Sequence, residues 1–303
     1  MFLKTKVVLG ATLAAAALST TSQAQPATRA GVQPGGEAGS RYYTEFSHVF
    51  DSSVSLEGVG LGDVSTTAAQ VSYQVSIPTS ERYAWIVGME LRGTWFDAPD
   101  AAPIPDGLYE TSLRVGNSWR FADRWRLQTL VSPGLYSDLE DVDGGDFNAP
   151  LLALAFWSVR ENLDLIGGLS LNLRRDVPVI PALGARWGFA DKWTLLAVYP
   201  SPRVEYAASD AVTVFAGAEL VRTAYRVGKN FGSELGRPAL NDEDLSYNEW
   251  RVGAGVRWSI SRSFVVALDG GWAGDREFNF EDADVELDGQ GAPYLQLAIS
   301  GSY

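Results

Sequence analysis

The sequence predicts an all-β fold: a single-chain antiparallel transmembrane β-barrel of about 14 strands, with short periplasmic turns and longer acidic extracellular loops. Three observations lead to this prediction. Apolar and polar residues alternate with period two through much of the chain. A Phe-Ala-Asp-x-Trp motif recurs where tight turns are expected. The chain ends in an amphipathic segment whose last residue, Tyr303, is aromatic.

The first residues have the layout of a secretory signal peptide. Lys4 and Lys6 precede an apolar, alanine-rich stretch at residues 7–18, and a small-x-small cleavage pattern ends at Ala24. The apolar stretch is shorter than the about 20 residues that a membrane-spanning helix needs. We therefore expect a signal peptide at residues 1–24, a flexible periplasmic leader at 25–40 and the outer-membrane barrel at 41–303.

The composition argues against several classes of function. The chain has no cysteine, so it has neither a disulfide framework nor thiolate chemistry. Its net charge of −13 argues against nucleic acid as a partner, because phosphate recognition needs basic clusters. No nucleotide-binding loop is present, and we expect no cofactor.

The clearest strand candidate is residues 83–96. Its odd positions are apolar and carry aromatic residues near both ends, Trp85 and Trp95, whereas Glu90 and Arg92 lie on the opposite face. An apolar band between two aromatic positions is typical of a strand that faces lipid.

Turn residues between the strand candidates give the order of the barrel. Phe121-Ala122-Asp123-Arg124-Trp125 recurs as Phe189-Ala190-Asp191-Lys192-Trp193, with looser versions around Asn162, Asp210 and Ser261. Asp, Asn and Ser favour tight turns. Every second connection is longer or acidic, at residues 51–63, 97–107, 136–149, 174–178, 226–246 and 279–290. Short turns on one side and longer loops on the other are the arrangement of outer-membrane barrels.

This alternation gives about 14 strands, an even number as in single-chain bacterial barrels. We expect them at residues 41–50, 64–77, 83–96, 108–121, 125–135, 150–160, 163–173, 179–189, 193–200, 202–208, 211–225, 247–259, 263–278 and 291–303. The link at residues 199–202 is shorter than the long loops that are expected on that side of the barrel. If 193–208 is one bulged segment, the count falls to about 12. The last strand should pair with the first, near 42–50, and leave no free edge.

Several segments resemble a family of bacterial outer-membrane barrels. They are WTLLAVYPSPRVEY at residues 193–206, VFAGAEL at 214–220 and YRV at 225–227. The family is an uncharacterised one of Gram-negative outer-membrane proteins, catalogued as a domain of unknown function. The resemblance implies a barrel over most of the exported chain. It implies no activity and assigns no functional residues.

The single histidine, His48, is a poor candidate for catalysis. Its alternation with Phe46 and Phe50 places it on the lipid-facing side, and its neighbour Ser47 points to the opposite face. A Ser-His hydrolase needs the nucleophile and an orienting group beside the base. We therefore predict that the protein is not an enzyme and has no catalytic, cofactor-binding or metal-binding residues.

Charged residues on the inward faces are the candidate functional residues. We predict that the lumen is lined by Glu90, Arg92, Glu110, Arg114, Arg126, Arg186, Glu219, Arg251, Arg257 and Asp269. In one interpretation they line an aqueous pore and set its selectivity, as charged rings do. In the other they pair across the lumen and close it. A barrel of about 14 strands is usually too wide to be filled by side chains, which favours the pore.

The sequence therefore favours a porin-like channel for passive diffusion of small solutes. The alternative is a closed structural or adhesive barrel that presents acidic loops, with an outer-membrane hydrolase a distant third. The expected partners are outer-membrane lipid, lipopolysaccharide and the barrel assembly machinery, which would read Tyr303 as an assembly signal. The substrate, the oligomeric state and divalent-cation binding at residues 141–146 stay open, and this loop lacks the closing Glu of a complete calcium loop.

Overall fold

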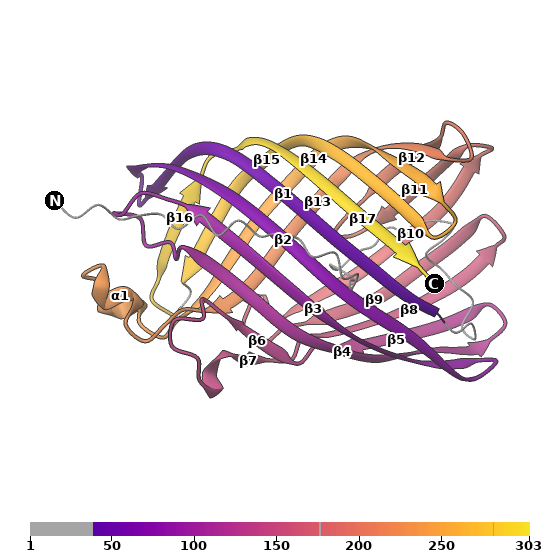
Figure 1. Ribbon diagram of the computed structural model, residues 1–303, viewed down its shortest axis with the longest axis horizontal. Helices are drawn as coiled ribbons and strands as arrows, with labels where there is room; N and C mark the ends of the chain where they lie inside the picture. Colours follow the sequence, from indigo (N-terminus) through magenta and orange to yellow (C-terminus); the bar gives the residue numbers. More distant parts are fainter. Residues whose placement is uncertain (1–38, 176, 281) are drawn as a thin grey trace.

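One antiparallel sheet closes on itself to form a barrel in the computed structural model (Figure 1). The structure describes residues 39–175, 177–280 and 282–303. The predicted signal peptide, and the predicted leader up to residue 38, lie outside the described residues.

Within the described residues, the sheet contains 17 strand segments. They are β1 (Gly39–Leu56), β2 (Val59–Ser80), β3 (Tyr83–Asp97), β4 (Gly107–Ala122), β5 (Trp125–Val131), β6 (Gly134–Ser137), β7 (Phe147–Asn148), β8 (Leu151–Arg160), β9 (Leu163–Leu171), β10 (Val179–Ala190), β11 (Trp193–Val198), β12 (Arg203–Ala207), β13 (Val212–Arg226), β14 (Asp244–Ser261), β15 (Phe264–Phe280), β16 (Val285–Gly289) and β17 (Ala292–Ser302). The helical segments are α1 (Phe231–Glu234), η1 (Gly144–Asp146) and η2 (Pro238–Leu240). No helix among the described residues is long and apolar enough to cross a membrane.

These segments make a barrel of 14 strands, as predicted. Three of the segments are continuations across a short interruption: β6 continues β5, β8 continues β7, and β17 continues β16. β11 and β12 pair with each other as separate antiparallel strands, with Trp193 opposite Tyr206. β11 also pairs with β10, and β12 also pairs with β13. The alternative of 12 strands is therefore wrong.

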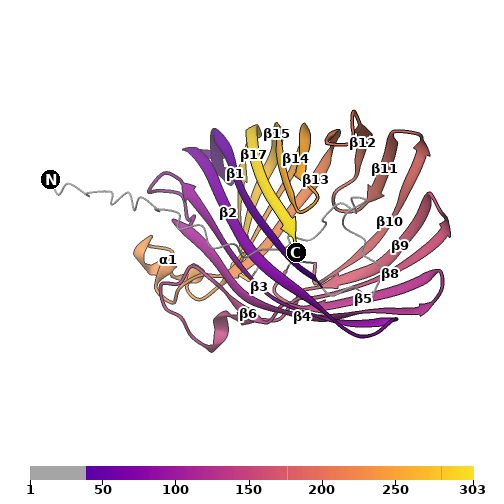
Figure 2. The same cartoon turned by 45° about the vertical axis from the view of Figure 1, so that its right-hand side comes forward.

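The first and last strands close the barrel. Residues 41–49 of β1 pair in antiparallel register with residues 294–302 of β17. At the end of this ladder, Ser40 and Tyr303 exchange two backbone hydrogen bonds of 3.0 Å. β1 and β17 lie side by side in both cartoon views (Figure 2). The predicted pairing of the terminal segments is confirmed, and the seam has no free edge.

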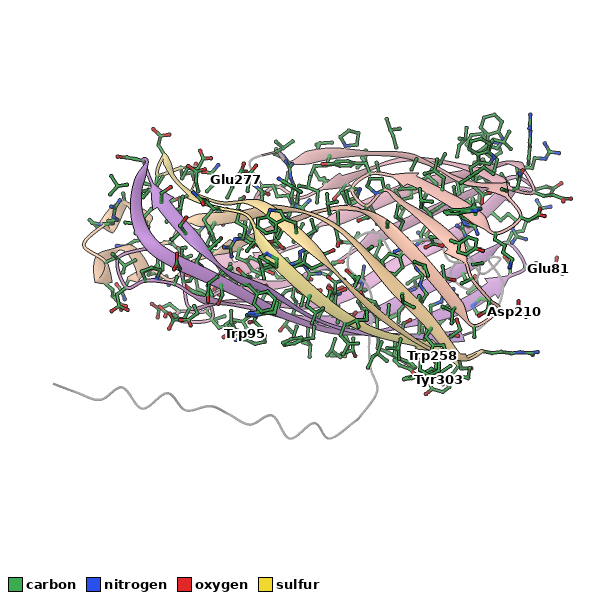
Figure 3. The ribbon with its side chains drawn as sticks, turned by 90° about the horizontal axis from the view of Figure 1, so that it is seen from above. Glu81, Trp95, Asp210, Trp258, Glu277 and Tyr303 are labelled. Atoms are coloured by element: carbon green, nitrogen blue, oxygen red, sulfur yellow. The ribbon has the colours of Figure 1, made fainter. Side chains whose placement is uncertain are left out.

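The two ends of the barrel differ in their connections. Glu81, Trp258 and Tyr303 lie toward the end with the short turns, which we name the turn end (Figure 3). Trp95 and Glu277 lie toward the opposite end, which carries longer connections and which we name the loop end. In outer-membrane barrels the short turns face the periplasm and the longer loops face the exterior.

Both copies of the Phe-Ala-Asp-x-Trp motif form the predicted hairpin turns. Ala122 pairs with Trp125 across the first turn, and Ala190 pairs with Trp193 across the second. Aromatic rings gather around these turns, where Trp125 stacks on Trp157 with ring centroids 5.3 Å apart. Such a cluster at one end of the wall is typical of an aromatic girdle at a membrane interface.

The outer surface of the wall is apolar. On β3, Trp85, Val87, Leu91 and Trp95 each expose 41–44% of their surface, whereas the inward-facing Glu90 exposes 4%. An apolar row with an aromatic residue at each end matches a surface that contacts lipid acyl chains.

At the loop end, strands extend beyond their predicted limits. Residues 51–63 do not form the predicted loop, because β1 and β2 run on and meet at Glu57-Gly58, whose φ values are 51° and 79°. A two-residue turn with positive φ at both positions suits the twist of a hairpin. Residues 279–290 likewise contain the end of β15 and all of β16. The prediction failed because the Asp, Ser and Gly residues of these hairpins are types that usually mark loops.

Candidate functional site: the lumen of the barrel

Apolar side chains fill the barrel at the loop end. Seventeen buried hydrophobic residues form one cluster there, which we name the loop-end core, and they come from β1–β4, β6, β13–β16, α1, η2 and the connecting loops. Phe278 is fully buried within it, with its ring centroid 5.3 Å from that of Phe96 and 4.9 Å from that of Tyr247. The loop end is therefore packed like the interior of a small domain.

The ring of strands narrows at this core. Ser137 of β6 forms a parallel bridge with Arg226 of β13, and the backbone N–H of Asp138 donates a 3.2 Å hydrogen bond to the Arg226 carbonyl. The Asp138 carboxylate accepts a 2.6 Å hydrogen bond from the backbone N–H of Gly228. β7 to β12 lie between β6 and β13 in the sheet order but take no part in this contact. Because fewer strands enclose a narrower space, the lumen widens toward the turn end.

A cavity of about 230 Å³ lies in the lumen beside the loop-end core, and we name it the upper cavity. Tyr136 and Tyr225 belong to both the core and the lining of the cavity. The predicted lumen residues that line it are Glu90, Arg92, Glu110, Arg114 and Glu219.

Charged side chains on one wall of the upper cavity are paired with each other. Arg114 donates a 2.5 Å hydrogen bond to Glu90, and the Gln70 amide donates a second one of 2.9 Å. Arg92 donates to the Gln70 carbonyl oxygen over 2.9 Å. The side chains of Glu90 and Arg114 are each only 6% exposed. A network of this kind holds the side chains in place along the wall.

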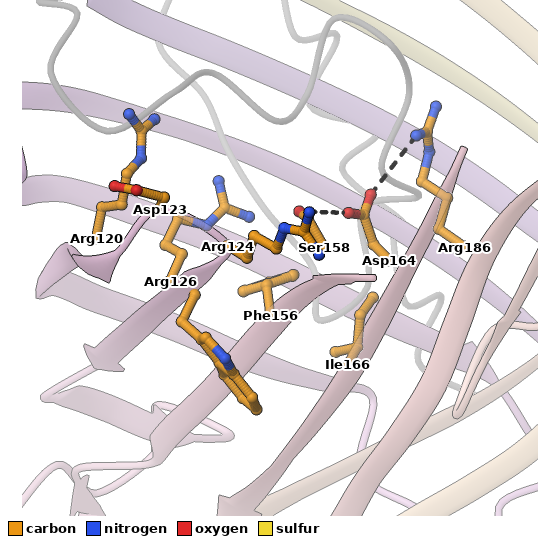
Figure 4. A pocket seen from close by; sticks show the side chains of 10 residues that line it. Arg120, Asp123, Arg124, Arg126, Phe156, Ser158, Asp164, Ile166 and Arg186 are labelled. Carbon is orange, nitrogen blue, oxygen red and sulfur yellow. Dashed lines mark hydrogen bonds and ion pairs between the residues drawn. The ribbon is translucent and has the colours of Figure 1, made fainter. Parts of the chain in front are cut away.

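A second cavity, of about 210 Å³, lies at the turn end, and we name it the lower cavity (Figure 4). Two of the predicted lumen residues, Arg126 and Arg186, line it together with Arg120 and Arg124. The Arg126 guanidinium carbon lies 4.2 Å from the centroid of the Phe156 ring, a cation–π contact that fixes its position.

Among the described residues, two acids line the lower cavity together with these arginines. Asp164 accepts a 2.7 Å hydrogen bond from Ser158 and lies 3.9 Å from Arg186 (Figure 4). The side chain of Asp123 is 92% exposed and lies 3.4 Å from Arg82. The described lining of the lower cavity, with four arginines and two aspartates, therefore has an excess of positive charge in a chain whose net charge is −13.

Arg251 and Asp269, also predicted for the lumen, line neither of these two cavities. Arg251 donates hydrogen bonds of 2.8 Å to Glu249 and 2.9 Å to Gln296. Asp269 accepts one of 3.3 Å from the Tyr294 hydroxyl. The Arg251–Gln296 contact spans from β14 to β17 across β15, and the Asp269–Tyr294 contact joins the paired strands β15 and β17.

Arg257, the last of the predicted residues, also lies outside both cavities and belongs to a second ion-pair network. Arg257 and Arg203 contact the same Glu205 carboxylate, at 3.0 Å and 2.5 Å. We did not predict Arg203 and Glu205 as lumen residues. Period-two alternation places both on one face of β12, but five residues are too few for the alternation to stand out.

His48 lies away from the lumen. Its Nδ1 atom is 2.9 Å from the Thr67 hydroxyl, and its ring contacts Phe50 edge-on with centroids 4.8 Å apart. Ser47 is 2% exposed and points to the opposite face of β1. Within the described part of the chain, no group of three or more His, Cys, Asp or Glu side chains is placed to hold a metal ion.

Ion pairs tie the acidic loops together at the loop end. Lys229 contacts the Asp143 carboxylate over 2.7 Å, and this hydrogen bond lowers the pKa of Asp143 below its ordinary value of 3.8. Arg226 donates a 2.9 Å hydrogen bond to Asp242, which lowers the pKa of that carboxyl in the same way. The acidic loop residues thus include ones that anchor the loops beside β13.

Comparison with solved structures identifies the fold as that of an outer-membrane β-barrel. The chain is similar to the COG4313 outer membrane channel from Pseudomonas putida F1, with a TM-score of 0.52 and 10% identity, over 93% of this chain and 100% of that chain. A FadL homologue from Pseudomonas aeruginosa is also similar, with a TM-score of 0.47 and 11% identity, over 91% and 93% of the two chains. Residues 40–288 match the model of a family described as a domain of unknown function, DUF6268. No curated protein matches by sequence.

Proposed function

This chain belongs to the DUF6268 family, and we propose that it is an outer-membrane channel for the passive diffusion of small solutes, with a preference for anions. We place it in the outer membrane of a Gram-negative cell, with the loop end toward the exterior and the turn end in the periplasm. Its apolar wall would contact outer-membrane lipid and lipopolysaccharide. The barrel assembly machinery would be the partner that reads Tyr303.

The lower cavity carries the preference for anions. A solute that passes between the lumen and the periplasm at this point meets Arg120, Arg124, Arg126 and Arg186. Positive side chains on a confined wall raise the local concentration of anions and exclude cations. Small anions such as chloride, phosphate and short carboxylates are therefore the solutes that this geometry favours.

The upper cavity supports transport because it contains space beside its ion pairs. The Glu90 network holds its own charges against the wall and leaves about 230 Å³ open beside it. Catalysis has no comparable support, since His48 lies on the outer side of the wall with Thr67 as its hydrogen-bond partner.

One observation favours a second function, a closed structural barrel. The loop-end core fills the end of the lumen that would face the exterior, with Phe278 and Leu245 fully buried. If this packing never opens and no other route exists, the protein stabilises the membrane or presents its acidic loops without conducting.

Measurements in planar bilayers distinguish the two functions. Folded protein should conduct, and a gradient of KCl should give a reversal potential of the sign expected for anion selectivity. Arg120→Ala and Arg126→Ala should move that potential toward cation selectivity. Arg262→Ala is the matched control, because this arginine lies in an exposed turn at the same end and should leave the potential unchanged.

Each preparation needs a test for folding, such as the heat-dependent electrophoretic mobility of a folded barrel. Folded protein that never conducts would support the closed barrel instead. A folded channel whose selectivity is unaffected by both cavity variants would show that the lower cavity does not set selectivity.

A further inference from the structure

The barrel wall is interrupted between β10 and β13. β11 pairs with β10 only from Gly184 toward the turn end, and β12 pairs with β13 only up to Gly217. Beyond these limits, residues 179–182 of β10 have ladder partners in β9, and residues 221–225 of β13 have ladder partners in β14. Two strand edges thus face each other across a gap that β11 and β12 are too short to fill.

Defined contacts frame this gap. On the side of the turn end, the link between β11 and β12 crosses the gap, and Leu220 donates a 3.0 Å backbone hydrogen bond to Pro200. On the other side, Arg175 donates a 3.2 Å hydrogen bond from Nη2 to the backbone carbonyl of Arg222. The gap is therefore bounded on each side by ordered groups.

The upper cavity extends into the gap. Residues 220–225 of β13 all line it, although successive residues of a strand point to opposite faces of the sheet. Residues 180–182 of β10 and 199–201 of the link also line it without alternation. Behind an intact wall, a cavity contacts inward-facing side chains only. The unbroken runs of lining residues therefore indicate that this cavity reaches around the strand edges toward the outer side of the wall.

The apolar surface of the wall continues around the gap. Val179 and Leu183 on β10 are 52% and 66% exposed, and Tyr199 in the link is 40% exposed. Leu173, in the loop before β10, is 78% exposed. Side chains of this kind are placed to contact lipid, so the gap faces acyl chains or their interface.

We infer that the gap is a lateral entrance, through which solutes with an apolar body pass between the outer leaflet of the membrane and the upper cavity. The inference rests on the proposed channel function and adds a route to it. The loop-end core fills the direct path along the barrel axis, so that only small solutes cross there, when this packing opens, and the gap reaches the lumen beside that core.

The charge inside the entrance indicates which apolar solutes it accepts. Among the described residues, the charged ones that line the upper cavity are Arg92, Arg114, Arg175 and Arg222, together with Glu90, Glu110 and Glu219. A net positive lining behind an apolar rim suits an amphipathic anion, whose apolar part crosses the rim while its acid group approaches the arginines. The solute class is therefore an alkyl or aryl carboxylate, sulfonate or phosphate.

The absence of cysteine from the chain permits a direct test. Tyr199→Cys introduces one thiol in the link that frames the gap, at a residue that lines the upper cavity and is 40% exposed. A bulky maleimide coupled to this thiol should block the entrance. Ala254→Cys is the matched control, because this exposed residue of β14 has ladder partners on both sides, away from the gap.

Flux into proteoliposomes is measured for two probes, a medium-chain alkyl sulfonate and methanesulfonate. The permanent charge of both probes slows their passage through lipid alone. Labelled Tyr199→Cys should lose the alkyl sulfonate flux and keep the methanesulfonate flux, whereas labelled Ala254→Cys should keep both. Heat-dependent mobility shows that each labelled barrel is folded.

Three results would overturn the inference. The first is an alkyl sulfonate flux that the label on Tyr199→Cys leaves intact. The second is a label that blocks both probes equally, because the gap would then not be a separate route. The third is unlabelled protein that passes methanesulfonate but not the alkyl sulfonate, which leaves the channel function standing. Unlabelled protein that passes neither probe contradicts the channel function itself, and the entrance with it.

Discussion

Tyr42 and Tyr303 stack on each other across the seam of the barrel, with ring centroids 5.7 Å apart and ring planes inclined by 24°. Tyr42 lies near the start of β1, and Tyr303 is the last residue of the chain. The backbone of Tyr303 is also hydrogen-bonded to Ser40. The terminal aromatic residue therefore contacts the first strand, and this structural role can be separated from the role that we propose for it in assembly.

We predict that Tyr303→Ala reduces the amount of assembled barrel in cells but leaves the channel activity of refolded protein unchanged. The lost ring contact is worth about 0.5–1.5 kcal/mol, too little to unfold a closed barrel. The measurement is the folded fraction in isolated membranes, by heat-dependent mobility. Tyr303→Phe should restore assembly, and Tyr206→Ala, at another aromatic of the turn end, should not impair it. Normal assembly of Tyr303→Ala would argue against an assembly signal at this residue.

We predict that Arg114→Ala lowers the free energy of unfolding by about 3–5 kcal/mol, because it leaves the buried carboxylate of Glu90 without its closest cation. Urea titration of the folded protein in lipid vesicles measures the change. The double variant Glu90→Gln/Arg114→Met removes both charges and should lose less stability than the single variant. Equal losses would show that the pair contributes through packing rather than through charge.

We predict that Phe278→Ala destabilises the barrel by about 3–5 kcal/mol, the usual cost of removing a buried phenylalanine ring. It should also raise single-channel conductance, because Phe278 is buried in the loop-end core that closes the axis. Trp272→Ala is the control, since this residue lies on the same strand but is 48% exposed on the outer surface. An unchanged conductance in folded Phe278→Ala would mean that other groups close the axial path.

We predict that the loops at the loop end loosen at acid pH. Lys229 and Arg226 hold the pKa values of Asp143 and Asp242 below 3.8, their ordinary value. The stability from these pairs is therefore fully present above pH 3.8 and is lost as the pH falls through the lowered pKa values of the folded state. Hydrogen exchange of residues 228–243, followed as a function of pH, measures the loosening.

The double variant Asp143→Asn/Asp242→Asn provides the control for this pH dependence. It should show the faster exchange already at neutral pH, with little further change on acidification. If the double variant exchanges as slowly as the wild type at neutral pH, the two ion pairs do not hold the loops.

The sequence was informative wherever the signal is local. The alternation from Trp85 to Trp95 correctly predicted a lipid-facing strand, because side chains of a strand point to opposite faces in turn. The two Phe-Ala-Asp-x-Trp motifs correctly predicted hairpin turns, because turn residues act over a few positions. The extended hairpin through Glu57-Gly58 was missed, because its polar and glycine residues are equally common in loops.

The lumen was harder to predict. The sequence alternation placed Glu90 and Arg114 on inward faces, but it gave no information on whether they face open space or each other. The loop-end core was not predicted, because Phe96, Tyr247 and Phe278 are far apart in the chain and meet only when their strands assemble. The lower cavity is similar in this respect, since it combines residues from five strands and a turn.

The sequence by itself determined the class of fold, the number of strands and the surface that faces lipid, because each depends on a period of two residues and on short turns. The tertiary structure alone decided where the lumen is filled, where it is open and where the wall is interrupted. These features depend on which distant segments meet at each height of the barrel, as Ser137 meets Arg226 and Arg175 meets Arg222. Such contacts are set by the lengths of all strands together, and a local pattern cannot specify them.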